Sequence, residues 1–253
     1  MKHTLTLAAW NFRLARRYLL ALWGIFAAQQ LALVVFRICW QGAAGMGLAS
    51  HCYVTMQIFA YLGFYLLTGL AAGLATRRAR SGYTWATLPG TPGQKFGAKA
   101  ITIAAAEVVF VAWQFVWYIV EFYPVTALEV HLARKLYGAA LPPANLYEQV
   151  VANNLFSRLL PRRPLQLVIL LGILALSALL LAALDTVRGW RKLPVFAVGG
   201  LCAWQCFYLV TVEQHPAWIF TSASRNVAMA LAAVLAVLTV WWAVRSIRRG
   251  ETC

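Results

Sequence analysis

Six apolar segments, each roughly 20 residues long, constrain the fold of this chain more than any other feature of its sequence. They lie at about residues 19–39, 53–75, 100–123, 165–185, 194–213 and 226–244. A helix of roughly 20 residues crosses the ~30 Å of hydrocarbon in a bilayer. Strands are not expected, because a chain without regular alternation cannot satisfy its backbone in lipid as a barrel. The pattern predicts an all-α integral membrane protein with six transmembrane helices in one domain, residues 1–253.

Composition agrees with this interpretation and argues against a nucleic-acid partner. Hydrophobic residues make up 62% of the 253 residues and charged residues 11%, whereas soluble domains have roughly 45–50% and about 25%. The net charge of +15 comes from Lys and Arg residues that lie between the apolar segments. Positive-inside topology explains that distribution better than a nucleic-acid surface does. We expect contact with the lipid bilayer and none with nucleic acid.

The distribution of basic residues predicts the orientation, because short cytoplasmic connections are enriched in Lys and Arg. Most of the basic residues fall on one side if both termini are cytoplasmic. That side receives Lys2, Arg13, Arg16, Arg17, Arg77, Arg78, Arg80, Lys95, Lys99, Arg188, Arg191, Lys192, Arg245, Arg248 and Arg249. The sequence therefore predicts a multi-pass protein with cytoplasmic N- and C-termini.

Two further segments are expected to lie along the membrane surface. Residues 1–18 have the pattern of an amphipathic helix suited to the inner headgroup region. Residues 124–164 are too long for an unstructured connection and contain two apolar helical faces separated by Pro142 and Pro143. We expect two amphipathic helices there on the outer face, the second beginning near Asn145. Five basic residues in this segment oppose the outer placement, but long connections cross despite their charge.

The connection between the second and third spans, residues 76–99, carries the strongest local signals. Thr91 is a good N-cap, Pro92 then occupies the first helical position and Gln94 the third. Thr91 and Gln94 can satisfy two backbone N–H groups reciprocally, in a capping box. A short helix over residues 81–88, stopped at the Pro-Gly that follows, would precede it.

This stretch resembles the membrane subunits of type-2 ABC exporters, which are bacterial six-span permeases. The family pattern is Leu-Pro, a small hydroxyl residue, an acidic or amide residue, an apolar residue and Lys. It is matched by Leu88, Pro89, Thr91, Gln94, Phe96 and Lys99. The overall layout is also similar, up to a short basic connection at residues 185–192. The chain departs from the pattern at Gly90, Pro92 and Gly93, and its long outer segment follows the third span instead of the fifth.

The resemblance implies a division of labour between subunits. The chain would lie in the bacterial cytoplasmic membrane and pair with a second permease subunit, as a homodimer or a related heterodimer. Cytoplasmic ATPase subunits would bind ATP and Mg, and this chain would bind no cofactor. The residues implied in ATPase coupling are Arg77, Arg78, Arg80, Tyr83, Trp85, Leu88, Pro89, Thr91, Gln94 and Lys99. The alternative is an ordinary basic loop followed by a capped helix.

Glu107, Gln114 and Glu121 recur every seven residues in the third span and share one helical face. Because a carboxylate near the bilayer centre costs about 2.5–3.5 kcal/mol on insertion scales, this polar seam should face protein or a transport path. Interhelical hydrogen bonding is the simpler alternative, with candidate partners at Gln29, Gln30, Gln57 and Gln205. Gly69 and Gly73 form a small-x-x-x-small pair that indicates close helix packing or a subunit interface.

No motif for catalysis, nucleotide binding or metal binding is present in the sequence. It lacks G-x-x-x-x-G-K-[ST] and H-E-x-x-H, and its histidines are scattered. We expect a transport subunit that is not itself an enzyme, moving a hydrophobic or amphipathic substrate such as an antimicrobial peptide or a lipid-like molecule. The alternatives are an intramembrane enzyme that uses Glu107 or Glu121, and a non-transporting membrane assembly or sensor protein.

Overall fold

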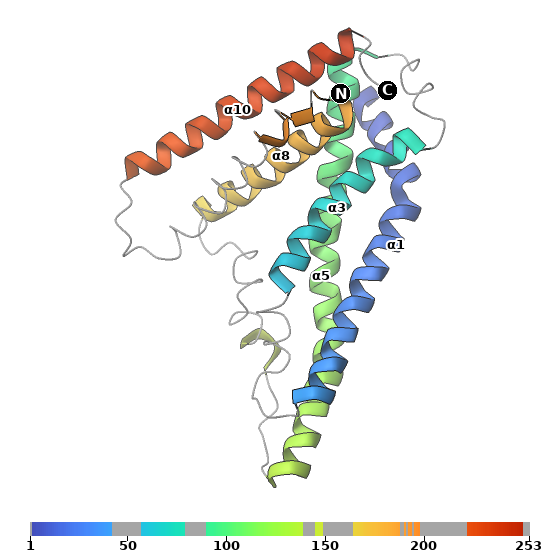
Figure 1. Ribbon diagram of the computed structural model, residues 1–253, viewed down its shortest axis with the longest axis vertical. Coiled ribbons are helices and arrows are strands. Elements are labelled where there is room, and N and C mark those ends of the chain that lie inside the picture. Colours follow the sequence, from blue (N-terminus) through green and yellow to red (C-terminus); the bar gives the residue numbers. More distant parts are fainter. Residues whose placement is uncertain are drawn as a thin grey trace. The chain divides into compact units, whose positions relative to one another are not determined.

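The described residues of the computed structural model form five long helices (Figure 1). They are α1 (Lys2–Gln41), α3 (Gln57–Arg78), α5 (Pro92–Tyr137), α8 (Pro164–Thr186) and α10 (Ser222–Arg248). The structure describes residues 2–41, 57–78, 90–138, 145–148, 164–187, 190, 192–193, 195–197 and 222–249. All regular structure among these residues is helical, as the sequence predicts, and no strand occurs in them.

One helix in the described part of the chain is long and apolar enough to cross a membrane, and it covers Pro92–Lys135. Two shorter apolar helices cover Gly63–Gly73 and Leu170–Thr186. The six spans expected from the sequence are therefore not reproduced as six such helices. Most of the expected fifth span lies outside the described residues.

The ends of α5 are set by local sequence signals. Gly90, just before the helix, has a φ of 146°, which side chains other than hydrogen rarely allow. At the other end Gly138 adopts a φ of 63°, and its N–H donates to the carbonyl of Arg134 at 3.2 Å. This is a left-handed glycine cap, and the basic Arg134 and Lys135 in the last turn suit the negative end of the helix dipole.

Two helices continue through positions where the sequence analysis separates elements. Residues 1–18 and the first apolar segment form one helix, α1. The third apolar segment and the first part of residues 124–164 also form one helix, α5, although Pro124 lies inside it. Proline removes one backbone donor without ending the helix here. Nearby, the Thr126 hydroxyl donates to the carbonyl of Phe122 at 2.8 Å. Further along the chain, Asn145 Oδ1 accepts from the N–H of Tyr147 at 3.0 Å, and a short helical stretch follows.

The chain divides into two compact units. Unit 1 comprises Met1–Tyr18, Gly69–Ala106 and Leu171–Cys253, and unit 2 comprises Leu19–Thr68 and Glu107–Leu170. Most of the long helices contribute residues to both units, whereas α10 belongs to unit 1.

Unit 2 is built on three helices, α1, α3 and α5, which pack through aromatic rings. Phe26 of α1 is fully buried, 4.5 Å from Phe64 of α3 and 5.5 Å from Phe110 of α5, between ring centroids. Trp23 donates from its indole nitrogen to the hydroxyl of Thr68 at 3.2 Å. From Trp23 to Phe26 the residue number rises along α1, while the contacted residue on α3 changes from Thr68 to Phe64. The two helices are therefore antiparallel, as their colours in Figure 1 show.

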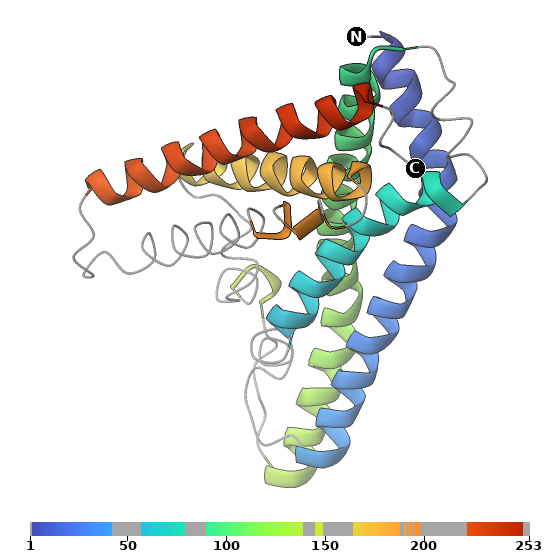
Figure 2. The same cartoon turned by 45° about the horizontal axis from the view of Figure 1, so that its top comes forward.

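In unit 1 the first turns of α1 pack against the start of α5. Leu7 and Ala8 form a buried cluster with Ala98, and Trp10 packs against its edge. The Thr102 hydroxyl lies 3.2 Å from the carbonyl of Ala8 and 2.8 Å from that of Ala98. In the same unit α10 runs beside the C-terminal part of α8 (Figure 2).

In the first turns of α1 some apolar side chains are buried and others are exposed. Leu7, Ala8 and Ala15 are buried, whereas Leu5 is 54% exposed. An amphipathic pattern identifies a helix with unlike faces, but it cannot say which residues a second helix will cover.

Candidate functional site

Two groups of polar residues merit attention as candidate functional sites. One is the seam on α5 in unit 2, and the other surrounds the start of α5 in unit 1. Each lies within a single unit, so its geometry is defined by the contacts of that unit.

The seam residues of α5 are buried. Glu107 and Gln114 are 0% exposed and Glu121 is 6% exposed. Gln114 Oε1 accepts a hydrogen bond from Gln30 Nε2 at 2.9 Å, so its partner is one of the four glutamines considered from the sequence. Glu107 Oε2 accepts from the Tyr65 hydroxyl at 3.0 Å. The seam therefore ties α5 to α1 through one bond and to α3 through another.

The opposite face of α5 is apolar and exposed. Val108, Val116 and Val120 are 49%, 53% and 56% exposed. A helix of a water-soluble domain buries its apolar face and turns its charged residues outward. In α5 the buried face combines apolar residues such as Phe110 and Tyr118 with carboxyl and amide groups, while branched aliphatic side chains lie outside. Such an arrangement suits a helix surrounded by lipid, where polar groups must find partners within the protein.

The start of α5 contains the capping box expected from the sequence. The N–H of Thr91 donates to Gln94 Oε1 at 3.0 Å, and the N–H of Gln94 donates to Thr91 Oγ1 at 3.3 Å. Pro92 is the first helical residue. Such a box satisfies two backbone donors that a helix start otherwise leaves open, and an N-cap is worth ~1 kcal/mol.

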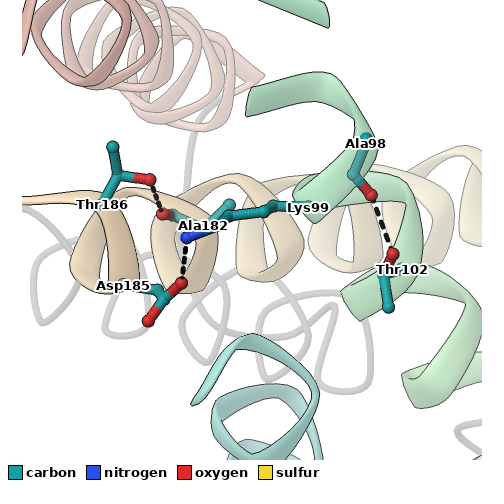
Figure 3. A network of polar contacts seen from close by, with 6 residues as sticks. All are labelled: Ala98, Lys99, Thr102, Ala182, Asp185 and Thr186. Carbon is teal, nitrogen blue, oxygen red and sulfur yellow. Dashed lines mark hydrogen bonds and ion pairs between the residues drawn. The ribbon is translucent and has the colours of Figure 1, made fainter. Parts of the chain in front are cut away.

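Lys99 occupies a different environment from the rest of the predicted coupling segment. Its ammonium forms a buried ion pair with the Asp185 carboxylate of α8 (Figure 3). The Lys99 side chain is 10% exposed and that of Asp185 is 3% exposed. Lys99 is among the residues that the family resemblance implies in ATPase coupling, whereas the sequence predicts no role for Asp185. The signal that was available is the position of Asp185 at the end of a long apolar run, where a lone acid needs a cationic partner.

The remaining residues of the predicted coupling set are only partly described. Arg77 and Arg78 are the last residues of α3, and their side chains lie outside what the structure describes. Arg80, Tyr83, Trp85, Leu88 and Pro89 lie outside the described residues altogether. Thr91 and Gln94 therefore act on the helix start, while the residues that would contact a partner remain a prediction.

Among the described residues no group of three or more His, Cys, Asp or Glu side chains is placed to hold a metal ion. No protein-family model matches the chain, and neither the curated proteins nor the solved structures give a significant match. The functional assignment consequently rests on the residues themselves.

Proposed function

We propose that the chain is the membrane permease subunit of an ATP-driven exporter of the type-2 ABC class. It would move a hydrophobic or amphipathic substrate with energy from a separate ATPase subunit. The observation that carries this proposal is the capped N-terminus of α5. The residues that resemble the family pattern lie immediately before this helix start and within its first turns. Leu88 and Pro89 precede a capping box made by Thr91 and Gln94, and the helix then runs on through the buried seam.

Placement in the cytoplasmic membrane is supported by the burial pattern of α5. A polar face made of Glu107, Gln114 and Glu121 is enclosed, while Val116 and Val120 are more than half exposed. In water that exposed surface would favour aggregation, whereas in lipid it is the expected outer face. Among the described residues one helix meets the length and composition of a span, so the six-span layout remains part of this proposal.

The proposed orientation is supported by the way the expected cytoplasmic and outer segments divide between the two units. The described parts of the four segments that the basic residues assign to the cytoplasm, within residues 1–18, 76–99, 185–192 and 245–253, all belong to unit 1. The described parts of the long outer segment, residues 124–138, 145–148 and 164, belong to unit 2, although residues 222–225 of another expected outer connection belong to unit 1. At the end of α10 the Arg245 guanidinium lies 5.0 Å from the Trp241 ring centroid, a pairing that suits a membrane interface.

The rival hypothesis of an intramembrane enzyme requires Glu107 or Glu121 to reach a substrate. Glu107 is enclosed by the side chains of unit 2 and accepts a hydrogen bond from Tyr65, so a substrate would have to displace that contact. The hypothesis of a sensor or assembly protein makes no demand on these residues. It differs from the exporter hypothesis in requiring no ATPase partner.

The test is affinity purification of the full-length chain from its native membrane in mild detergent. The proposal predicts that a protein with a phosphate-binding loop co-purifies and hydrolyses ATP. Substitution of Leu88 and Pro89 together by alanine should release it or lower its activity, whereas Arg13→Ala, at an exposed position of α1, should not. Recovery of the intact chain without any nucleotide-binding protein would contradict the proposal.

A further inference from the structure

The ion pair between Lys99 and Asp185 joins two helices at a defined point of unit 1. Lys99 lies two turns after the capping box that starts α5, and Asp185 lies one residue before the end of α8. Figure 3 shows the Lys99 side chain directed at Asp185, with Thr102 on the same stretch of α5 and Thr186 beside Asp185. The two threonine hydroxyls donate to carbonyls of their own helices, Ala98 and Ala182, so they do not compete for the charged groups.

A third helix closes the site from another side. A methyl group added at Gly73 of α3 would lie 3.3 Å from Asp185 Cβ and 3.4 Å from its carboxyl carbon. Such a contact would be tighter than most contacts of a Cβ atom, so an alanine at this position would press on Asp185. The carboxylate is therefore held between Gly73 and Lys99, and its position is set by packing as well as by charge.

Asp185 is also the only acidic residue among the described residues of unit 1. Exposed arginines are plentiful there, for example Arg13, Arg16 and Arg245. The single carboxylate is nevertheless buried and paired with Lys99, which is itself buried. Asp185 therefore pairs with a buried lysine although exposed arginines are present in the same unit. The ion pair lies where α5 contacts α8.

A buried ion pair is a poor source of stability, because desolvation of both charges offsets their attraction. Replacement by well-packed apolar residues is often neutral or stabilising. What such a pair does supply is a directional contact that fixes how two helices are aligned along and around their axes. In this chain it joins the start of α5 to the end of α8.

We propose that Lys99 and Asp185 are positioning residues that make the end of one cytoplasmic connection and the start of another move together. The connection before α5, residues 76–91, would be held to the connection after α8, residues 186–192, through this ion pair. The inference rests on the proposed function, in which an ATPase displaces the first connection. The ion pair then carries that displacement to α8, which has no contact of its own with the ATPase in this scheme.

The decisive variants separate charge from packing. Lys99→Met with Asp185→Leu removes the ion pair and keeps the volume apolar. Lys99→Asp with Asp185→Lys keeps the ion pair and reverses it. Arg13→Ala serves as the control at an exposed basic position of the same unit. Each chain is reconstituted with its ATPase in lipid nanodiscs, and thermal stability, the amount of ATPase bound and the rate of ATP hydrolysis are measured.

The variant with the apolar pair should fold with wild-type stability and bind the ATPase. Its stimulation of the rate of ATP hydrolysis should fall by about tenfold, which is within the usual range of coupling between sites. The reversed pair and the Arg13→Ala control should keep that stimulation. If the ion pair had a purely structural role, thermal stability and the stimulation of ATP hydrolysis would fall together. If the apolar pair stimulates hydrolysis as well as the wild type does, the inference is wrong.

Hydrogen exchange on the chain alone separates this inference from the proposed function. Lys99→Ala should speed amide exchange in both residues 92–100 and residues 178–186, and the reversed pair should restore it. If wild-type chain binds no ATPase, the proposed function fails, and the exchange data still decide whether the ion pair positions α5 on α8. Unchanged exchange after Lys99→Ala would overturn the positioning role itself.

Discussion

Gln30 of α1 donates a hydrogen bond to Gln114 of α5 at 2.9 Å, across a sequence separation of 84 residues. Phe26 and Phe110, one turn earlier on each helix, keep the same separation and lie 5.5 Å apart between ring centroids. A constant separation means that the two helices run parallel in a fixed register. One polar bond and one aromatic contact therefore define how α1 lies on α5 in unit 2.

A double-mutant cycle tests this register. Gln30→Leu and Gln114→Leu should each lower the free energy of unfolding, and the pair should show a coupling of about 0.6 kcal/mol, the mean for hydrogen bonds between membrane helices. Gln29→Leu, next to Gln30 on α1, should show no coupling with Gln114→Leu. The measurement is unfolding in detergent mixtures, and equal coupling for Gln29 and Gln30 would contradict the register.

Two glycines of α3 should respond in opposite ways to alanine. Gly73→Ala places a methyl group against Asp185, so overpacking should lower the free energy of unfolding by about 1–3 kcal/mol. Gly63 has nothing within 4 Å of the added methyl position. Gly63→Ala should therefore be neutral or stabilise the helix by roughly 0.5–1 kcal/mol. The same unfolding assay reads both, and a reversed order would show that α3 does not approach α8 at Gly73.

The exposed valine face of α5 is predicted to contact lipid. Val116→Arg places a cation there and should impair membrane insertion, with a penalty of about 2.5–3.5 kcal/mol near the span centre. Val116→Leu should insert normally. On a water-exposed helix the arginine would be tolerated within about 0.5 kcal/mol. The fraction of protein integrated in membranes after carbonate extraction distinguishes the two environments.

Asn11 is a buried amide that the fold does not satisfy. Its side chain is 1% exposed, and neither amide atom has a hydrogen-bond partner among the described residues. An unsatisfied buried polar group costs ~1–3 kcal/mol, so Asn11→Leu should raise the free energy of unfolding. Asn11→Asp should lower it, because a charge would then be buried. A loss of stability in the leucine variant would indicate that Asn11 serves a partner or a bound water.

Local signals were the most predictable part of the fold. Thr91, Pro92 and Gln94 specify the start of α5 through contacts within one turn, so no knowledge of the rest of the chain is needed. The three seam residues were also readable, because a spacing of seven places them on one face whatever packs against it. Their burial follows from the cost of polar groups in an apolar helix.

Contacts between distant residues were not predictable in the same way. Four glutamines were equally plausible partners for Gln114, and only the register of α1 on α5 selects Gln30. The pairing of Lys99 with Asp185 spans 86 residues and depends on how α5 crosses α8. Helix continuity was not predictable either, because the boundaries expected near residue 18 and at Pro124 lie inside α1 and α5, which continue through them.

In-cell photocross-linking tests whether residues 76–91 face a cytoplasmic ATPase, as the proposed function requires. A photoreactive phenylalanine derivative replaces Trp85, inside the predicted coupling segment, and in a matched strain it replaces Tyr123, an exposed residue of α5. The account predicts that position 85 forms an adduct with a protein carrying a phosphate-binding loop, while position 123 does not. An adduct of position 85 with proteins on the outer side of the membrane would contradict this placement. So would adducts that include no nucleotide-binding protein.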